Sequence, residues 1–482
     1  MKFIVKIHPE VFIKSKSVRN CFTKILECNI RIILKRRTKF VEVFNRRDHI
    51  EVNLQSQKYS DEILKALTHI PGIHYILEVQ QSNFIDVNDI CKQVLDLHCA
   101  NIERKTFVVR VKRRGKHNFT STELECQIGG VLNQAVNSAC VKLVNPDVTI
   151  NIEVINKQLN QVLSCHKGLG GFPLGTQEDV LSLISGGFDS AVSSYLHIKR
   201  GSKTHYCFFN LGGSTHEIGV KQVSYFLWKK YGSSAKVKFL EINFESVVAE
   251  ILEKIEDSQM GVVLKRMFIR AGTMLAKKYN IQALVTGEAL GQVSSQTLTN
   301  LRCINSVTDI LVLRPLINWD KEDIIRVARD IGTEIFSRFI PEYCGVISKK
   351  PTVKAVIKKL EDEERKFDFS LLEHAVNNSH VVDIRDIKKE SFGVVSKIEQ
   401  VKTVEKHSII LDIRSPDEKD NTPLKIDGAK VQHLPFFRLS TQFGSLDQNK
   451  TYLLYCAHGI MSRIQALHLQ EDGFDNVKIY RP

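Results

Sequence analysis

The sequence predicts a multidomain α/β protein whose largest part is a doubly wound, mostly parallel sheet. The chain has 482 residues, enough for about three or four domains of ordinary size. Between residues 180 and 335, apolar segments alternate with helical ones, which is typical of parallel sheets covered by helices. We expect strands at 180–184, 205–209, 237–242, 282–286 and 310–316. We expect helices at about 189–199, 216–231, 245–256 and 262–279.

Composition and cysteine usage narrow the class of protein. Hydrophobic residues make up 43% and charged residues 25%, as in ordinary globular proteins. No apolar run approaches the roughly 18 residues of a membrane span, and the N-terminus has no secretory h-region, so we expect no membrane association. The 11 cysteines include no C-x-x-C pair, so zinc ribbons and thioredoxin motifs are not supported, and we expect no metal site built by the protein. We therefore expect reduced thiols and a cytoplasmic location.

The first third of the chain is distinctly basic. Residues 1–170 carry a net charge of +10, and the remaining residues +4. The densest cluster lies in the first 60 residues, which we interpret as a small α+β unit with one charged face. A solvated surface is the ordinary explanation of such a run, but polyanion binding is the functional alternative. The cluster consists of Arg31, Lys35, Arg36, Arg37, Lys39, Arg46 and Arg47.

A second basic segment follows at residues 107–117. Val109 and Val111 alternate with Arg110 and Lys112, the pattern of a half-buried strand. A helix is expected at about 121–135 and a further alternating strand at 148–154. A sheet with a basic edge and a helix packed on it suits contacts to phosphate backbones. The candidate RNA-binding residues are Arg110, Lys112, Arg113, Arg114 and Lys116.

Glycine, proline and charged segments suggest where the domains meet. Four glycines and a proline in residues 166–179 indicate a linker. Residues 350–400 are charged and helical in character, most simply a solvated helix face. From about residue 404 a last α/β unit begins, with strands at 409–412 and 452–455 and a helix at 462–470.

The strongest motif is Ser-Gly-Gly-Phe-Asp-Ser at residues 185–190. It follows an apolar strand and opens a helix, so the glycines and free N–H groups can surround a phosphate. It is neither a Walker A motif nor G-x-G-x-x-G. It resembles the loop of the PP-loop ATP pyrophosphatase family.

That resemblance implies that the loop grips the pyrophosphate of ATP while a substrate is adenylated. It also implies that adenine lies against the backbone of Leu183 and Ile184. A glycine-rich turn without function is the alternative. The loop residues expected to bind ATP are Ser185, Gly186, Gly187 and Ser190.

Three later segments can complete such a site, although each alone is weak. Lys265 lies in a basic segment that we place near a helix start, where it can bring a cation to phosphates. Gly287 permits close approach after the strand at 282–286, and Gln296 can bond a base or ribose. Lys321 is a candidate for stabilising charge on an adenylated intermediate. A surface helix or an ordinary loop is the alternative for the segments of Lys265 and of Gly287 to Gln296.

The second strong motif surrounds Cys456. This cysteine follows an apolar strand and is set in a loop that opens a helix, where backbone N–H groups can hold an anionic sulfur. The segment resembles the rhodanese loop C-x-x-G-x-x-S, which implies a persulfide carrier. Met461 stands where rhodaneses commonly have Arg, which argues against thiosulfate as donor. A buried core cysteine is the alternative. A second loop cysteine, Cys344, lies between Pro341 and Gly345 and can act as a resolving thiol.

Taken together, the motifs resemble the tRNA 4-uridine sulfurtransferase (4-thiouridine synthetase) family over the whole chain. The resemblance implies a ferredoxin-like unit at 1–60, a THUMP RNA-binding domain at 61–165 and a linker at 166–179. A PP-loop adenylation domain at 180–395 and a rhodanese domain at 404–482 complete the expected organisation.

The same resemblance implies a reaction. A cysteine desulfurase loads Cys456 with a persulfide, and ATP with Mg²⁺ adenylates uridine 8 of tRNA, a step for which Asp189 and Lys321 are important. Sulfur transfer leaves a Cys344–Cys456 disulfide. The family also passes sulfur to a ubiquitin-like carrier protein for the thiazole of thiamine. A homodimer is compatible with the sequence but is not required by it.

Two other classes of function stay open from the residues alone. A PP-loop amidotransferase or synthetase acting on a small metabolite needs neither the basic first third nor Cys456. A non-enzymatic RNA-binding protein with relic domains has no need of residues 185–190, Lys321 and Cys456 together.

Overall fold

The computed structural model describes residues 2–46, 48–211, 213–338, 340, 350–387 and 399–404. Between 408 and 481 it describes all residues except 415–418, 421, 425, 427–428, 436–438, 440–441, 457–461, 463–464, 467–468 and 471. The chain divides into two compact units, of which the first ends near Gln177 and also takes in residues 199–201 and 233–235. No helix in the described ranges has the length and apolar character that a membrane crossing requires.

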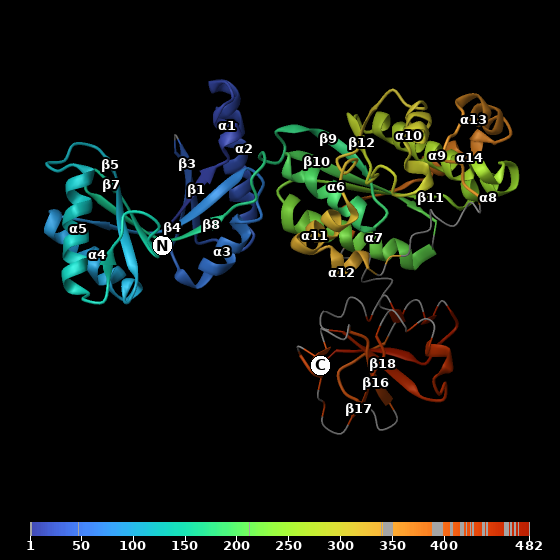
Figure 1. The fold of residues 1–482 in the computed structure, drawn as a ribbon. Helices are drawn as coiled ribbons and strands as arrows, with labels where there is room; N and C mark the ends of the chain where they lie inside the picture. Colours follow the sequence, from blue (N-terminus) through green and yellow to red (C-terminus); the bar gives the residue numbers. More distant parts are fainter. Residues whose placement is uncertain are drawn as a thin grey trace. The chain divides into compact units, whose positions relative to one another are not determined.

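The first unit is built on one eight-stranded sheet with the order β2-β3-β1-β4-β8-β7-β5-β6 (Figure 1). Its N-terminal part pairs antiparallel throughout, and Leu26 and Ile30 of α2 belong to the same buried core as Phe3 and Val5 of β1. The elements of this part are β1 (Lys2–Ile7), α1 (Pro9–Phe12), α2 (Lys16–Lys35), β2 (Val41–Asn45), β3 (His49–Leu54), η1 (Gln57–Tyr59), α3 (Ser60–Leu67) and β4 (Ile73–Asn83).

The rest of that sheet carries the predicted basic strand. Val109 and Val111 are buried while Arg110 and Lys112 are exposed, which confirms the alternation. The predicted helix at 121–135 is confirmed. It begins at Ser121 because Thr120 and Glu123 form a capping box there. The elements here are α4 (Val87–Ile102), β5 (Thr106–Arg114), α5 (Ser121–Ala135), β6 (Cys140–Val141), β7 (Val148–Ile155) and β8 (Gln158–Lys167).

The second unit contains a six-stranded sheet with the order β13-β12-β9-β10-β11-β14. Its strands are β9 (Gln177–Leu183), β10 (Ser202–Asn210), β11 (Lys238–Asn243), β12 (Ala283–Val285), β13 (Leu311–Leu313) and β14 (His380–Asp383). All five strands predicted between 180 and 316 are present. The chain moves outward from β9 through β10 to β11 and then returns to the other side of β9 with β12. This reversal creates a topological switch point, where ligands bind in doubly wound folds.

Helices lie on both sides of that sheet, α9 and α10 on one and α7, α11 and α12 on the other (Figure 1). They are α6 (Phe188–Lys199), α7 (Gly213–Leu227) with η2 (Trp228–Gly232), α8 (Glu245–Lys254), α9 (Asp257–Lys278), α10 (Leu298–Asn305), α11 (Lys321–Ile331), α12 (Glu334–Ser337), α13 (Ile357–Glu364) and α14 (Phe369–Asn377), with the turn η3 (Ser294–Gln296). The predicted charged helices after residue 350 are α13 and α14. The edge strand β14 was not predicted; it pairs antiparallel with β11.

A smaller sheet of five strands forms near the C-terminus, with the order β15-β19-β18-β16-β17 and only parallel pairs. Its elements are β15 (Gln400–Val401), β16 (Ser408–Asp412), β17 (Lys430–His433), η4 (Phe443–Ser445), β18 (Thr451–Tyr455) and β19 (Val477–Tyr480). The two strands predicted here are confirmed as β16 and β18. Part of the predicted helix at 462–470 lies outside the described residues.

Candidate active site

The glycine-containing loop joins β9 to α6 in the way the motif predicts. Ser190 fastens it: the backbone N–H and the hydroxyl of Ser185 both donate to Ser190 Oγ at 3.2 Å, and that hydroxyl donates to the carbonyl of Gly187 at 3.1 Å. Gly186 has φ +84°, in the left-handed region that favours glycine, and a Cβ there would lie 2.5 Å from Cδ1 of Ile340. The loop is therefore held in shape by its own side chains.

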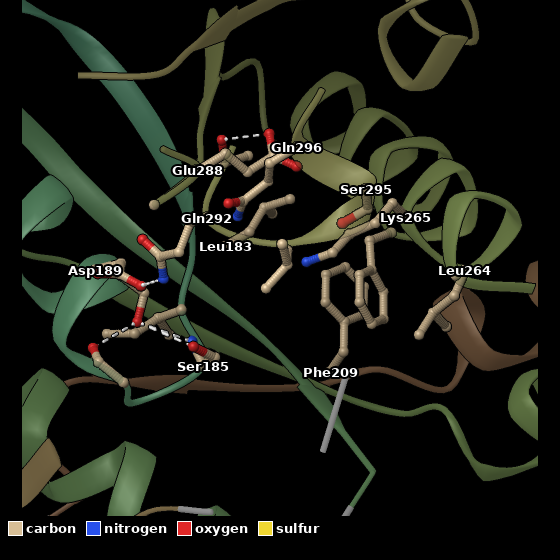
Figure 2. A pocket seen from close by; sticks show the side chains of 18 of the residues that line it. Leu183, Ser185, Asp189, Phe209, Leu264, Lys265, Glu288, Gln292, Ser295 and Gln296 are labelled. Carbon is tan, nitrogen blue, oxygen red and sulfur yellow. Dashed lines mark hydrogen bonds between the residues drawn. The ribbon is translucent and has the colours of Figure 1, made fainter. Parts of the chain in front are cut away.

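A cavity of about 240 Å³ opens beside this loop at the carboxyl ends of β9, β10 and β12 (Figure 2). Of the residues predicted to bind ATP or to act on it, all but Gly186 and Lys321 line it. The predicted residues on its wall are Leu183, Ile184, Ser185, Gly187, Asp189, Ser190, Lys265, Gly287 and Gln296. Residues more than 100 positions apart in the sequence thus meet in one pocket at the switch point.

The Asp189 carboxylate accepts hydrogen bonds from a residue of α11 and from a residue of the loop after β12. Lys321, at the first position of α11, donates to both carboxylate oxygens of Asp189 at 2.8 and 2.9 Å. Gln292 donates its side-chain amide to the same carboxylate at 2.9 Å (Figure 2). The Lys321 side chain is 39% exposed, so this ion pair stays in contact with solvent. The two residues predicted to act in adenylation are therefore in direct contact.

The close approach expected of Gly287 is to the loop itself. A Cβ at this position would lie 2.6 Å from the carbonyl carbon of Asp189 and 2.7 Å from the backbone nitrogen of Ser190. Any larger residue would push the strand end of β12 away from the start of α6.

The placement of Lys265 near a helix start is wrong. Helix α9 begins at Asp257, so Lys265 lies in its middle. Lys265 does line the cavity, but its neighbour Arg266 is 2% exposed and points away, into an ion pair with Glu364. The sequence pattern did not predict the helical turn at 257–261, because these residues carry only one large apolar side chain.

Sequence reasoning missed an aromatic and polar part of the wall. Phe209 and Phe268 stack with their ring centroids 4.5 Å apart. His216 donates from Nε2 to the carbonyl of Ser185 at 3.1 Å, and burial lowers its pKa, partly opposed by that hydrogen bond. Glu288, directly after Gly287, is also on the wall. Their only sequence signal is that Phe209 stands at the carboxyl end of one apolar strand and Glu288 comes shortly after another.

Cys456 lies directly after β18, as predicted. It is 8% exposed, and its Sγ accepts a hydrogen bond from the backbone N–H of Ser462 at 3.3 Å, with the Ser462 hydroxyl 3.5 Å away. A backbone donor at the sulfur suits an anionic sulfur species. Residues 457–461 between them, and the predicted resolving thiol Cys344, lie outside the described residues. The ten cysteines in the described part of the chain are all free thiols.

The five candidate RNA-binding residues differ in whether their side chains have hydrogen-bond or ion-pair partners within the protein. Arg110, Arg113 and Arg114 have partners within the first unit; the closest contact joins Arg114 to Asp48 at 2.8 Å. Lys112 and Lys116 are exposed and have no hydrogen-bond or ion-pair partner among the described residues. In the same ranges, no group of three His, Cys, Asp or Glu side chains is arranged to hold a metal ion.

Fold and site together define a class of protein, a multidomain α/β enzyme with a PP-loop pocket and a rhodanese-like domain. Four family models match successive parts of the chain. They are the ThiI ferredoxin-like domain at 2–76, the THUMP domain at 82–160, Thiamine biosynthesis protein (ThiI) at 175–369 and the Rhodanese-like domain at 394–481.

Full-length relatives give the family. Proteins named tRNA sulfurtransferase from Vibrio parahaemolyticus and Aliivibrio fischeri are 70% and 67% identical to this chain, and each match covers 100% of both sequences. The chain belongs to the tRNA sulfurtransferase family.

Solved structures agree on the fold. A 4-thiouridine synthetase crystallised with RNA and ATP has a TM-score of 0.70 at 23% identity, covering 80% of this chain and 99% of that chain. A Pyrococcus horikoshii protein has a TM-score of 0.54 at 21% identity, covering 69% of this chain and 100% of that chain.

Proposed function

We propose that this chain is an ATP-dependent sulfurtransferase that converts uridine 8 of tRNA to 4-thiouridine through an adenylated uridine. The observation that supports this most is the meeting of the PP-loop residues, Asp189 and Lys265 in one pocket, in a chain that also holds Cys456 at a strand end. Curated relatives named tRNA sulfurtransferase, and a fold shared with a 4-thiouridine synthetase, point the same way.

In this proposal the pocket binds ATP. The hydroxyls of Ser185 and Ser190 and the N-terminal N–H groups of α6 hold the pyrophosphate, and adenine lies against the backbone of Leu183 and Ile184. Lys265 and Lys321 offset the charge that develops as O4 of the uridine attacks the α-phosphate. The products are the adenylated uridine and pyrophosphate.

Mg²⁺ is expected to enter with ATP. Magnesium sites usually combine one or two carboxylates with substrate phosphates, and the wall of the pocket supplies the carboxylate of Asp189 beside the phosphate loop. The donor set of the pocket therefore fits the ion, which would neutralise phosphate charge.

The sulfur step uses two cysteines. The terminal sulfur of a Cys456 persulfide attacks C4 of the adenylated uridine and displaces AMP, which is a far better leaving group than a uracil oxygen. The Cys344 thiolate then attacks Cys456 Sγ, which releases the 4-thiouridine and leaves a Cys344–Cys456 disulfide. A cellular dithiol reductant returns both thiols. In a second version, Cys344 releases sulfide from the persulfide first, and sulfide attacks C4.

The remaining partners follow from the same proposal. A cysteine desulfurase supplies the persulfide in the cytoplasm, and the basic strand of the first unit, with Arg110, Lys112, Arg113, Arg114 and Lys116, holds tRNA phosphates. The rhodanese-like domain also passes sulfur to a ubiquitin-like carrier protein for thiazole synthesis, which the match to a thiamine biosynthesis family supports.

The test is a thiolation assay with unmodified tRNA, ATP, Mg²⁺, cysteine and a cysteine desulfurase, with 4-thiouridine measured by its near-ultraviolet absorbance. We expect product from the natural chain and none from Cys456→Ala or Asp189→Ala. ATP–pyrophosphate exchange should persist in Cys456→Ala. Exchange without any thiolation by the natural chain would show an adenylating enzyme with a different acceptor.

A further inference from the structure

Glu288 is a buried carboxylate on the wall of the pocket that the proposed reaction does not use. Its side chain is 7% exposed. Thr286 donates its hydroxyl to Oε2 at 3.0 Å, and Arg314 donates from Nε to the same oxygen at 2.8 Å. Thr286 and Arg314 follow the neighbouring parallel strands β12 and β13, so the carboxylate is fixed by the sheet edge itself.

The second carboxylate oxygen of Glu288, Oε1, is available to a ligand. Oε1 accepts no hydrogen bond from any described residue, although Glu288 lines the cavity. Gln296, which Figure 2 draws on the same wall, also has a buried Oε1 without a hydrogen-bond partner in the described part of the chain. The buried acceptor of Gln296 costs free energy unless a donor reaches it, and the free oxygen of Glu288 belongs to the same wall, so this part of the wall can receive a hydrogen-bond donor of the ligand.

The charge and the position of Glu288 select which part of a nucleotide this is. The free carboxylate oxygen of Glu288 can only accept a hydrogen bond, and the ionised phosphates of ATP carry no donor, so its partner is the ribose or the base. Gly287 touches the peptide between Asp189 and Ser190, so Glu288 is anchored one residue from the phosphate loop. The part of ATP that adjoins its phosphates and carries donors is the ribose; the amino group of adenine lies at the far end of the base.

We propose that Glu288 is a specificity-determining residue that accepts a hydrogen bond from a ribose hydroxyl of ATP, with Arg314 as the positioning residue that fixes its carboxylate. This inference rests on the proposed binding of ATP in this pocket. It gives the pocket a means of distinguishing ribonucleotides from deoxyribonucleotides. A hydrogen bond to a charged acceptor is strong enough for discrimination of about ten- to a hundredfold.

The test measures binding of ATP, 2′-deoxyATP and 3′-deoxyATP to the full chain with Mg²⁺ by titration calorimetry. The natural chain should bind at least one deoxynucleotide about tenfold or more weakly than ATP. In Glu288→Gln that ratio should fall below about threefold, because the variant loses affinity for ATP and little for the analogue. A ratio of two affinities does not depend on how much of the protein is folded.

Two further variants keep the result interpretable. Glu288→Gln with Arg314→Gln removes both charges at once, so no buried guanidinium is left unpaired, and it should also lose the discrimination. Glu334→Gln alters a matched carboxylate that pairs with Arg329 and Arg338 away from the cavity, and it should discriminate as the natural chain does.

Three outcomes would overturn the inference while ATP binding stands: no discrimination by the natural chain, unchanged discrimination in Glu288→Gln, or equal loss of affinity for all three nucleotides. Failure of the natural chain to bind ATP at all would instead remove the proposed function on which the inference depends.

Discussion

Two ion pairs in the six-stranded sheet domain use similar side chains in different surroundings. Arg266 and Glu364 are 2% and 5% exposed and meet through two hydrogen bonds of 2.6 and 2.8 Å, with Arg270 on the same carboxylate. Asp189 and Lys321 are 17% and 39% exposed and meet at the rim of the pocket. The first pair ties α9 to α13, and the second joins the loop at residues 185–190 to α11.

The two pairs differ in whether their charged groups remain accessible to a ligand. Arg266 also donates to the carbonyl of Cys303 at 2.7 Å and to Ser306, so its donors are used within the protein. Asp189 lines the cavity, and the ammonium of Lys321 remains in contact with solvent, where phosphates can reach it. Burial therefore marks the first pair as structural, whereas the second pair stays accessible to a ligand.

The largest effect is expected from breaking the buried pair. Glu364→Ala leaves the Arg266 guanidinium buried without its carboxylate, which should reduce the free energy of unfolding by about 3–5 kcal/mol. Denaturation of the full chain, followed in the sheet domain by hydrogen exchange, measures this loss. ATP affinity at a temperature where the variant is folded should stay within about threefold of the natural chain. A change in stability of under about 1 kcal/mol would show that the pair is dispensable.

The open pair should give the opposite result. Asp189→Asn keeps the shape of the side chain but removes the charge beside the phosphate loop, so the rate of ATP–pyrophosphate exchange should fall by about a hundredfold or more. Its effect on stability should stay within about 1 kcal/mol, because the pair is open to solvent.

The matched control for that prediction is Asp323→Asn. Asp323 pairs with Arg326 on the exposed side of α11, and its replacement should change neither rate nor stability. If Asp189→Asn unfolded the domain while its rate per folded molecule stayed normal, the assignment of the two pairs would be reversed.

The contrast between the pairs also explains what the sequence could and could not predict. The loop at 185–190 is a local pattern of strand, glycines and helix, and the hydrogen bonds of Ser190 that shape it lie within six residues, so it was predicted well. The Arg266–Glu364 contact joins residues 98 positions apart, and neither side chain stands in a motif. Glu288 was not predicted, because its partner Arg314 becomes a neighbour only when β12 and β13 pair.

Edges and helix starts were the least predictable part of the fold. β14 has only four residues within a charged segment, and its place beside β11 depends on tertiary pairing. The first turn of α9 carries little apolar signal, which is why Lys265 was placed at a helix start. Cys344 remains a prediction, since it lies outside the described residues.

The same comparison extends to the cations of the first unit, with smaller effects. Lys112 and Lys116 are open, whereas Arg114 is engaged by Asp48. Replacing both lysines by Ala should weaken tRNA binding several-fold and lower the slope of log affinity against log salt by about 1 to 2. Arg114→Ala should lower the slope by less. Binding measured from 50 to 300 mM salt checks this, and an unchanged slope in the double variant would exclude the strand from the RNA-binding surface.

The smallest effect concerns the pH dependence of the Arg114–Asp48 contact. Burial raises the pKa of Asp48, but hydrogen bonds from Arg114 and His49 outweigh it and hold that pKa well below its usual range. The folded state therefore binds the proton less readily than the unfolded state. The stability contributed by Asp48 is complete above the unfolded pKa of about 3.9, decreases as the pH falls below that value, and is fully lost only below the folded pKa. Because Asp48 is 37% exposed, solvent screening limits the contribution to under about 1 kcal/mol. Asp48→Asn should thus reduce the hydrogen-exchange protection of β3 and β5 more at pH 6 than at pH 2.5, whereas Asp96→Asn, at an exposed position of α4, should change neither. A loss of equal size at both pH values would mean that shape, not charge, holds the two strands' ends together.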